Sequence, residues 1–124
     1  MLIISKYIAK HELKPLLKHF GVDDIIEGAE KVLRNITIAI KPPQKLPGFQ
    51  FFKVRVGEKD QGRMIVFMMI ENRKVVPLLI RLKKDKIFGM NMAMNNPRVV
   101  DQIKKNLSRV LSDIQQKKYE EFPL

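Results

Sequence analysis

Apolar positions near the start of the chain predict a strand followed by a helix. Residues 2–4 form a short apolar run that suits a buried strand. From Lys6 to Phe20 apolar residues recur at helical spacing. Pro15 removes a backbone donor inside this stretch, so we expect two short helical pieces or one kinked helix. Gly21 then ends the segment.

A second helix is predicted to follow directly. Asp23 or Asp24 can cap its N-terminus, and an apolar stripe runs from Ile25 to Ile36 at helical spacing. We place the end of this helix at about Ile38. The prolines and the glycine of residues 41–48 cannot continue it and predict a loop.

The pattern then changes to a period of two. Residues 51–56 alternate between apolar and basic positions, and residues 63–70 are almost wholly apolar, as expected of a central strand. The intervening residues 57–62 form a turn, and a third strand is predicted over residues 74–83. Pro77 lies inside this third strand and implies an edge position or a bulge, because proline cannot donate to a strand ladder. The short connections predict an antiparallel meander.

A long amphipathic helix is predicted near the C-terminus. Asn96 and Pro97 suit the N-cap and the first helical position, and apolar residues at helical spacing continue to about Lys118. The preceding GMNMAMNN segment, residues 89–96, has methionines at a period of two, which fits an added strand or a partner-binding surface.

These elements predict a single domain over residues 1–124. The fold class is α+β, with an antiparallel β-meander sheet packed against two N-terminal helices. The C-terminal helix, at about residues 97–118, is an extension of that unit.

Positive charge is concentrated in the strand region. The chain has 24 Lys and Arg against 13 Asp and Glu, a net charge of +11. Residues 41–90 hold 12 of the basic side chains and 4 of the acidic ones, while the flanking segments are closer to balance. A local field of this kind favours a polyanion, and we expect nucleic acid, RNA in particular. An acidic protein partner and a merely solubilising surface are the alternatives.

Strand alternation predicts which cations act together. Lys53 and Arg55 share a face of the first meander strand, Arg81 and Lys83 share a face of the third, and Arg63 opens the strand between them. We expect these cations to converge on one exposed sheet face, with the helices covering the other and acidic neighbours confined to the turns. Phosphate oxygens are their natural complement. The alternative is that they only solvate the sheet.

Other chemistry finds little support in the sequence. The chain has no cysteine and two histidines, His11 and His19, so we expect no metal site and no cofactor. No Ser-His-Asp set, HExxH motif or phosphate-binding glycine loop is found. The apolar run Ile65–Ile70 is too short to span a membrane, and Met1–Ile4 lacks the apolar stretch of a secretory signal. We therefore expect a cytoplasmic protein with no membrane partner.

The strand region resembles a known family. Residues 46–84 read LPGFQFFKVRVGEKDQGRMIVFMMIENRKVVPLLIRLKK. They contain a leucine and glycine before a KVRVG strand, an arginine that opens an apolar strand, and a KVV strand that ends in basic residues. This pattern resembles the sheet of RelE-type toxins of toxin–antitoxin modules. The preceding strand and two helices follow the order found in that family, so the resemblance covers residues 1–88.

The resemblance implies a toxin of a type II toxin–antitoxin module in the RelE/ParE superfamily, held inactive by a cognate acidic antitoxin protein. RelE-like members cut ribosome-associated messenger RNA without a metal. The ribose 2′-OH attacks the adjacent phosphate, and basic side chains stabilise the developing charge. By position, the catalytic residues would be Arg63 and Arg81. The nucleic-acid-binding residues would be Lys53, Arg55, Lys83 and Lys84.

One departure from the family pattern concerns proton transfer. Active members place a tyrosine or histidine shortly after the last strand, where this chain has Phe88. Tyr119 lies much further on, beyond the long helix. Two alternatives to a metal-independent endoribonuclease therefore stay open: a non-catalytic RNA- or DNA-binding module on the same fold, and a ParE-like gyrase inhibitor.

Overall fold

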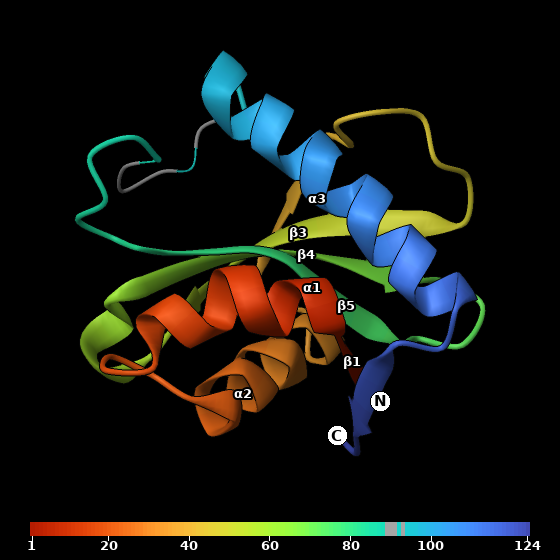
Figure 1. Cartoon of the computed structure of the whole chain (residues 1–124), viewed down its shortest axis with the longest axis horizontal. Coiled ribbons are helices and arrows are strands. Elements are labelled where there is room, and N and C mark those ends of the chain that lie inside the picture. The colour runs from red at the N-terminus through yellow and green to blue at the C-terminus, as the bar shows by residue number, and fades with distance from the viewer. Residues whose placement is uncertain (89–91, 93) are drawn as a thin grey trace.

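The computed structural model describes residues 1–88, 92 and 94–124 and has an α+β fold built on one sheet (Figure 1). Six strands lie in the order β2-β3-β4-β5-β1-β6. Their bounds are β1 Leu2–Ser5, β2 Ile38–Ile40, β3 Phe49–Val56, β4 Gly62–Met69, β5 Val75–Leu82 and β6 Tyr119–Phe122. The helices are α1 Lys6–Ile8, α2 Val22–Leu33 and α3 Pro97–Gln115. The expected α+β fold with its long C-terminal helix is confirmed.

The predicted meander of three antiparallel strands is β3-β4-β5. The side chains of the even-numbered residues of β3 and β4 face α2. A Cβ added at Gly28 of that helix would lie 2.7 Å from Cγ1 of Val56 and 3.0 Å from Cε of Met64. Helix α2 therefore packs directly on these two strands, and their odd-numbered side chains point to the opposite face.

Pro77 sits at a bulge and not at an edge. Ile65 is opposite Leu79, whereas the next residue, Val66, is opposite Pro77, so the register shifts by one residue at this point. Strand β5 lies inside the sheet, between β4 and β1. The sequence predicted that Pro77 lies either in an edge strand or at a bulge, and the structure has it at a bulge.

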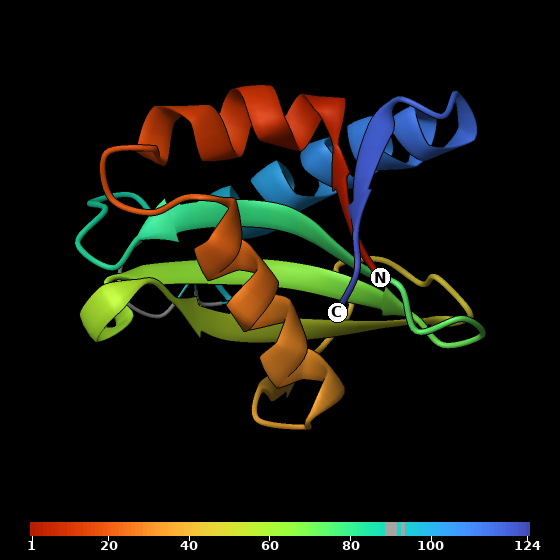
Figure 2. The same cartoon turned by 90° about the horizontal axis from the view of Figure 1, so that it is seen from below.

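The N-terminal helical segment runs alongside β5. It is irregular, as Pro15 predicts: α1 continues as a π-helix, η1 Ala9–Leu13, and a 3₁₀ turn, η2 Lys14–Leu16. It takes this place because β1 is short and parallel to β5, with a single paired position at Leu2 and Val75. Beyond that pair, the outer edge of β5 faces helices (Figure 2).

Two boundaries differ from the sequence prediction. Helix α2 ends at Leu33, not near Ile38, because Asn35 turns the chain with a positive φ of 59°. Residues Ile38–Ile40 then form the edge strand β2 beside β3. At the N-terminus of α2 the cap residue is Gly21, not an aspartate, and the Asp24 carboxylate accepts the Gly21 N–H at 3.0 Å. Strand β6, which pairs with β1, was also not predicted.

The helices occupy both sides of the sheet. Helix α2 lies on one face, and α3 crosses the other face over β5 and beside α1 (Figures 1 and 2). The expectation that one face carries helices and the other carries only cations is therefore wrong. Strands β4 and β5 are buried almost throughout, as expected of central strands.

Two further expectations concern membranes and the methionine segment. No helix among the described residues is long and apolar enough to cross a bilayer. Residues 89–91 and 93 lie outside the described residues, so the proposed strand or partner surface at Met90, Met92 and Met94 stays a prediction. Met92 itself is buried.

Candidate nucleic-acid interface

Three arginines stand in line across the meander. Arg55 of β3 is directly opposite Arg63 of β4, and Arg63 is directly opposite Arg81 of β5. Directly opposed residues of neighbouring strands project from the same face, with Cβ atoms roughly 5 Å apart. We call Arg55, Arg63 and Arg81 the arginine row. It lies on the face opposite α2, as the sequence predicted for these three residues.

The bulge at Pro77 brings Arg81 into this row. Before the bulge Phe67 pairs with Val76, and continuing that register would place Ile80 opposite Arg63. Because strand side chains alternate, Arg81 would then point to the face covered by α2. The one-residue shift instead sets Arg81 beside Arg63.

Lys53 adds a fourth cation to the same face. It lies two residues before Arg55 in β3, so their side chains point the same way. Burial lowers the pKa of the Lys53 ammonium, and the charges of Arg63 and Arg55 lower it further. These cations are therefore close enough to repel one another.

Arg63 is the buried member of the arginine row. Its residue exposure is 7%, and its Nη1 donates to the backbone oxygens of Asp60 at 2.8 Å and Gly62 at 3.0 Å. Burial and the neighbouring Arg55 lower the pKa of the Arg63 guanidinium, while Asp60 opposes that shift. Arg55, by contrast, has a side chain that is 65% exposed and only a long 3.9 Å contact with Asp60. Arg55 is thus the member of the row best placed to meet a partner.

Arg81 has a buried counter-charge that the sequence analysis missed. The carboxylate of Glu12, from η1, accepts a hydrogen bond from Arg81 Nη1 and is itself only 3% exposed. The expectation that acids occur only in the turns is therefore wrong. Glu12 lies four residues after Ile8 and four before Leu16, within the apolar stripe of its helical segment. This spacing is the sequence signal that indicates a buried position for Glu12.

Glu12 also accepts a backbone hydrogen bond from the outer edge of β5. Its Oε1 accepts the Ile80 N–H at 2.8 Å, and Asn106 of α3 donates to its Oε2 at 3.2 Å and to the Leu78 carbonyl oxygen at 2.7 Å. Burial raises the pKa of the Glu12 carboxyl, and the charge of Arg81 together with these hydrogen bonds opposes that rise. The carboxylate thus joins η1, β5 and α3.

Lys83 and Lys84 lie directly after the end of strand β5. Strand β5 ends at Leu82, and the Lys83 N–H donates to the Gln61 carbonyl oxygen at 2.7 Å. Both lysines are exposed. With Lys59, they line a shallow depression of about 300 Å³. That Lys83 shares the face of Arg81 stays a prediction, and Lys83 and Lys84 extend the basic surface at this end of the sheet.

After β5, at the place where the resemblance expects a tyrosine or histidine beside Arg81, the chain has Phe88. The ring of Phe88 lies against the Arg81 guanidinium, 4.6 Å from Cζ to the ring centroid. Tyr119 is in β6, on the far side of β1 from β5. Within the described part of the chain, no cluster of three metal-ligating side chains occurs.

Comparison with known proteins gives no relative: no family model, no curated protein and no solved structure matches the chain. The resemblance to RelE-type toxins therefore stays a prediction.

Proposed function

We propose that this chain is a cytoplasmic RNA-binding protein that holds the phosphate backbone against the arginine row. The observation that carries the proposal is the register that aligns Arg55, Arg63 and Arg81 on one sheet face. Arg55 and Lys53 meet phosphate oxygens directly, and the buried Arg63 adds its charge to the field beneath them. Arginine and lysine contacts of this kind supply most of the affinity of backbone binding.

The test compares two variants that each remove two positive charges. Lys53→Gln/Arg55→Gln, called the row variant, changes the exposed Arg55 of the row and the half-buried Lys53 beside it, and Lys41→Gln/Lys45→Gln changes two exposed lysines of the loop between β2 and β3. We expect the row variant to bind single-stranded RNA about tenfold more weakly at moderate salt, with a salt slope less steep by roughly 1.4. The loop variant should stay within about twofold of wild type. Equal losses in both variants would contradict the proposal.

A second candidate function is that of a RelE-type toxin, a ribosome-associated endoribonuclease controlled by an acidic antitoxin. The observation that favours it is that Lys53, Arg55, Arg63 and Arg81, which the resemblance assigns to RNA binding and cleavage, share one face. Attack by the ribose 2′-OH builds negative charge on the phosphate, and such a cluster would stabilise it. Against cleavage stand the burial of Arg63, the ion pair of Arg81 with Glu12, and Phe88.

Growth and product analysis separate binding from cleavage. A toxin arrests growth when expressed, and Lys53→Gln/Arg55→Gln relieves the arrest. These two residues are better targets than Arg63 and Arg81, whose hydrogen bonds hold a turn and a helix in place. Harmless expression with intact RNA would contradict the toxin function and leave RNA binding standing.

A further inference from the structure

A second basic surface lies where α1 and α3 run side by side. The Tyr7 N–H donates to the Asp113 carboxylate at 2.8 Å, and Cζ of Arg109 lies 6.0 Å from the Tyr7 ring centroid. Next to them, the Lys6 N–H donates to the Lys118 carbonyl oxygen at 3.0 Å. The outer side chains of the two helices therefore belong to one continuous surface.

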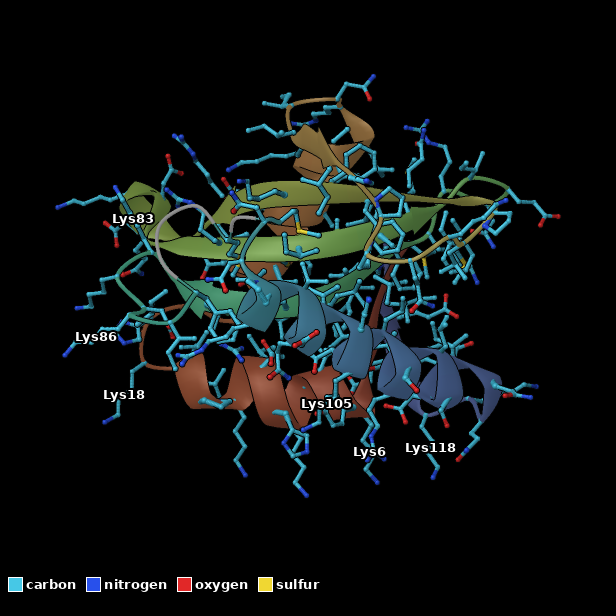
Figure 3. All side chains as sticks on the ribbon, turned by 90° about the horizontal axis from the view of Figure 1, so that it is seen from above. Lys6, Lys18, Lys83, Lys86, Lys105 and Lys118 are labelled. Carbon is cyan, nitrogen blue, oxygen red and sulfur yellow. The ribbon has the colours of Figure 1, made fainter. Side chains whose placement is uncertain are left out.

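The exposed cations of this surface form what we call the basic ridge: Lys6, Lys10, Lys14, Lys18, Lys105, Arg109 and Lys118. The first four recur every fourth residue along the N-terminal helical segment and the turn after it, and all four are exposed. In Figure 3 the labelled Lys6, Lys105 and Lys118 project from the same side of the molecule.

Few acidic groups offset this charge. Between Lys6 and Lys18 the only acid is Glu12, which is buried against Arg81, and in α3 Asp113 is used by the Tyr7 N–H. Asp101 of α3 is exposed, and the exposed Glu120 lines the same cavity as Lys6 and Lys118 at one end of the ridge. Among the ion pairs of the described residues, none includes a member of the ridge. The ridge therefore presents largely uncompensated positive charge to a partner.

The ridge is shaped for a rigid polyanion. Its cations recur along the whole N-terminal helical segment, from Lys6 to Lys18, and continue on α3 with Lys105 and Arg109. The apolar residues of the same segment, such as Ile8 and Leu13, are buried in the protein core. An interfacial membrane helix needs that apolar side free to enter the lipid, so a bilayer fits poorly.

We propose that the basic ridge binds the phosphate backbone of a double-stranded RNA segment adjoining the single strand on the arginine row. Double-stranded RNA is recognised through its shape and its phosphates, which suits a surface of exposed lysines. Lys18 of the ridge lies at the same end of the molecule as Lys86 and Lys83, the latter just after the strand that carries Arg81 (Figure 3). They give the RNA a continuous basic path. The inference rests on the proposed function of the row.

The test uses two RNA probes and three full-length variants. One probe is a hairpin with a short single-stranded tail, and the other is the tail alone. The ridge variant is Lys10→Gln/Lys14→Gln, the row variant is Lys53→Gln/Arg55→Gln, and the matched control is Lys41→Gln/Lys45→Gln. Circular dichroism and thermal melts verify that each variant keeps the fold.

We expect the ridge variant to bind the tailed hairpin about tenfold more weakly, with a salt slope less steep by roughly 2, and to bind the tail alone like wild type. The row variant should weaken both probes. If the ridge variant matches the control on both probes, or weakens both equally, the ridge inference fails and the row stands. If the row variant matches the control on both, the proposed function fails. Loss of binding to phosphatidylserine vesicles, with hairpin binding intact, would assign the ridge to membranes and overturn the inference.

Discussion

Glu12 combines a structural and an electrostatic role in one side chain. It neutralises Arg81 and accepts the backbone N–H of Ile80, which β1 is too short to reach. Asn106 holds it from the side of α3. A buried carboxylate is stable only with such partners. We therefore expect a replacement of Glu12 to lower the free energy of unfolding.

Glu12→Gln is predicted to lower the free energy of unfolding by about 1–3 kcal/mol, because the amide sets its own NH₂ group against the donors that surround this position, the Ile80 N–H, Arg81 and Asn106. The measurement is urea unfolding at neutral pH. Glu27→Gln, at an exposed position of α2, is the control and should change stability by less than about 0.5 kcal/mol. Equal effects of the two changes would contradict the role assigned to Glu12.

The same pair of variants predicts a pH dependence. Burial raises the pKa of Glu12 above 4.5, so the folded protein holds this proton more tightly than the unfolded chain does. The stability contributed by the protonated group is therefore full below pH 4.5 and is lost as the pH rises through the raised pKa. We expect this decline in the wild type and in Glu27→Gln but not in Glu12→Gln. Parallel stability–pH curves for all three proteins would show that Glu12 does not titrate in this way.

Lys53 reports on the charge of the arginine row. Its pKa is lowered by burial and by Arg63 and Arg55. Removing one of these charges in Arg55→Gln should move the Lys53 pKa up towards its usual range. An NMR titration of the Lys53 side chain measures the shift, with Lys41→Gln as the control. A Lys53 pKa that is the same in Arg55→Gln and in wild type would show that the two cations are not neighbours.

At the scale of elements, the contact between α2 and the sheet depends on Gly28. Alanine in a helix is usually favoured over glycine by about 1 kcal/mol, but here its Cβ would lie 2.7 Å from the stiff side chain of Val56. We expect Gly28→Ala to destabilise the protein by about 1–3 kcal/mol, because the overlap outweighs the helix propensity. Thermal unfolding measures this, with Glu27→Ala as the control. A more stable Gly28→Ala protein would mean that α2 sits further from β3 than the structure has it.

The sequence predicted the long elements and missed the short ones. The alternation in β3 and the apolar run of β4 are strong patterns because both strands are eight residues long. Strand β2 has three residues, and Ile36, two residues before it, continues the helical spacing of α2. Strand β6 is a four-residue edge strand whose two central residues are glutamates. Patterns this short do not distinguish a strand from a helix end or a loop.

The sequence predicts which basic residues form the candidate site, but not the strand register and the ion pair that hold Arg81 in it. Alternation placed Lys53 and Arg55 on one face, and that local rule is reliable within a strand. The alignment of Arg81 depends on the one-residue register shift at the bulge. Pro77 indicates that a bulge is possible, but the sequence does not specify the register that follows it. The Glu12–Arg81 pair joins residues 69 positions apart, and an isolated acid in a helix normally faces water.

At the scale of the whole molecule, charge is separated by face. The N-terminal forty residues are nearly neutral in sum, yet their acids gather in α2, at Asp23, Asp24, Glu27 and Glu30. Helix α2 lies on the face opposite α3 (Figure 2). The arginine row and the basic ridge lie away from it. Such an asymmetric field would orient a polyanion towards one side of the protein before contact.

The most direct test of the central claim is a titration of the arginine side-chain N–H signals with single-stranded RNA, followed by NMR. If phosphates lie on the arginine row, the Arg55 signal moves most and Arg81 moves with it. Arg34, which is equally exposed to solvent after α2 but lies near Glu30, should stay in place. An unmoved Arg55, or an Arg34 shift as large as that of Arg55, would contradict the account.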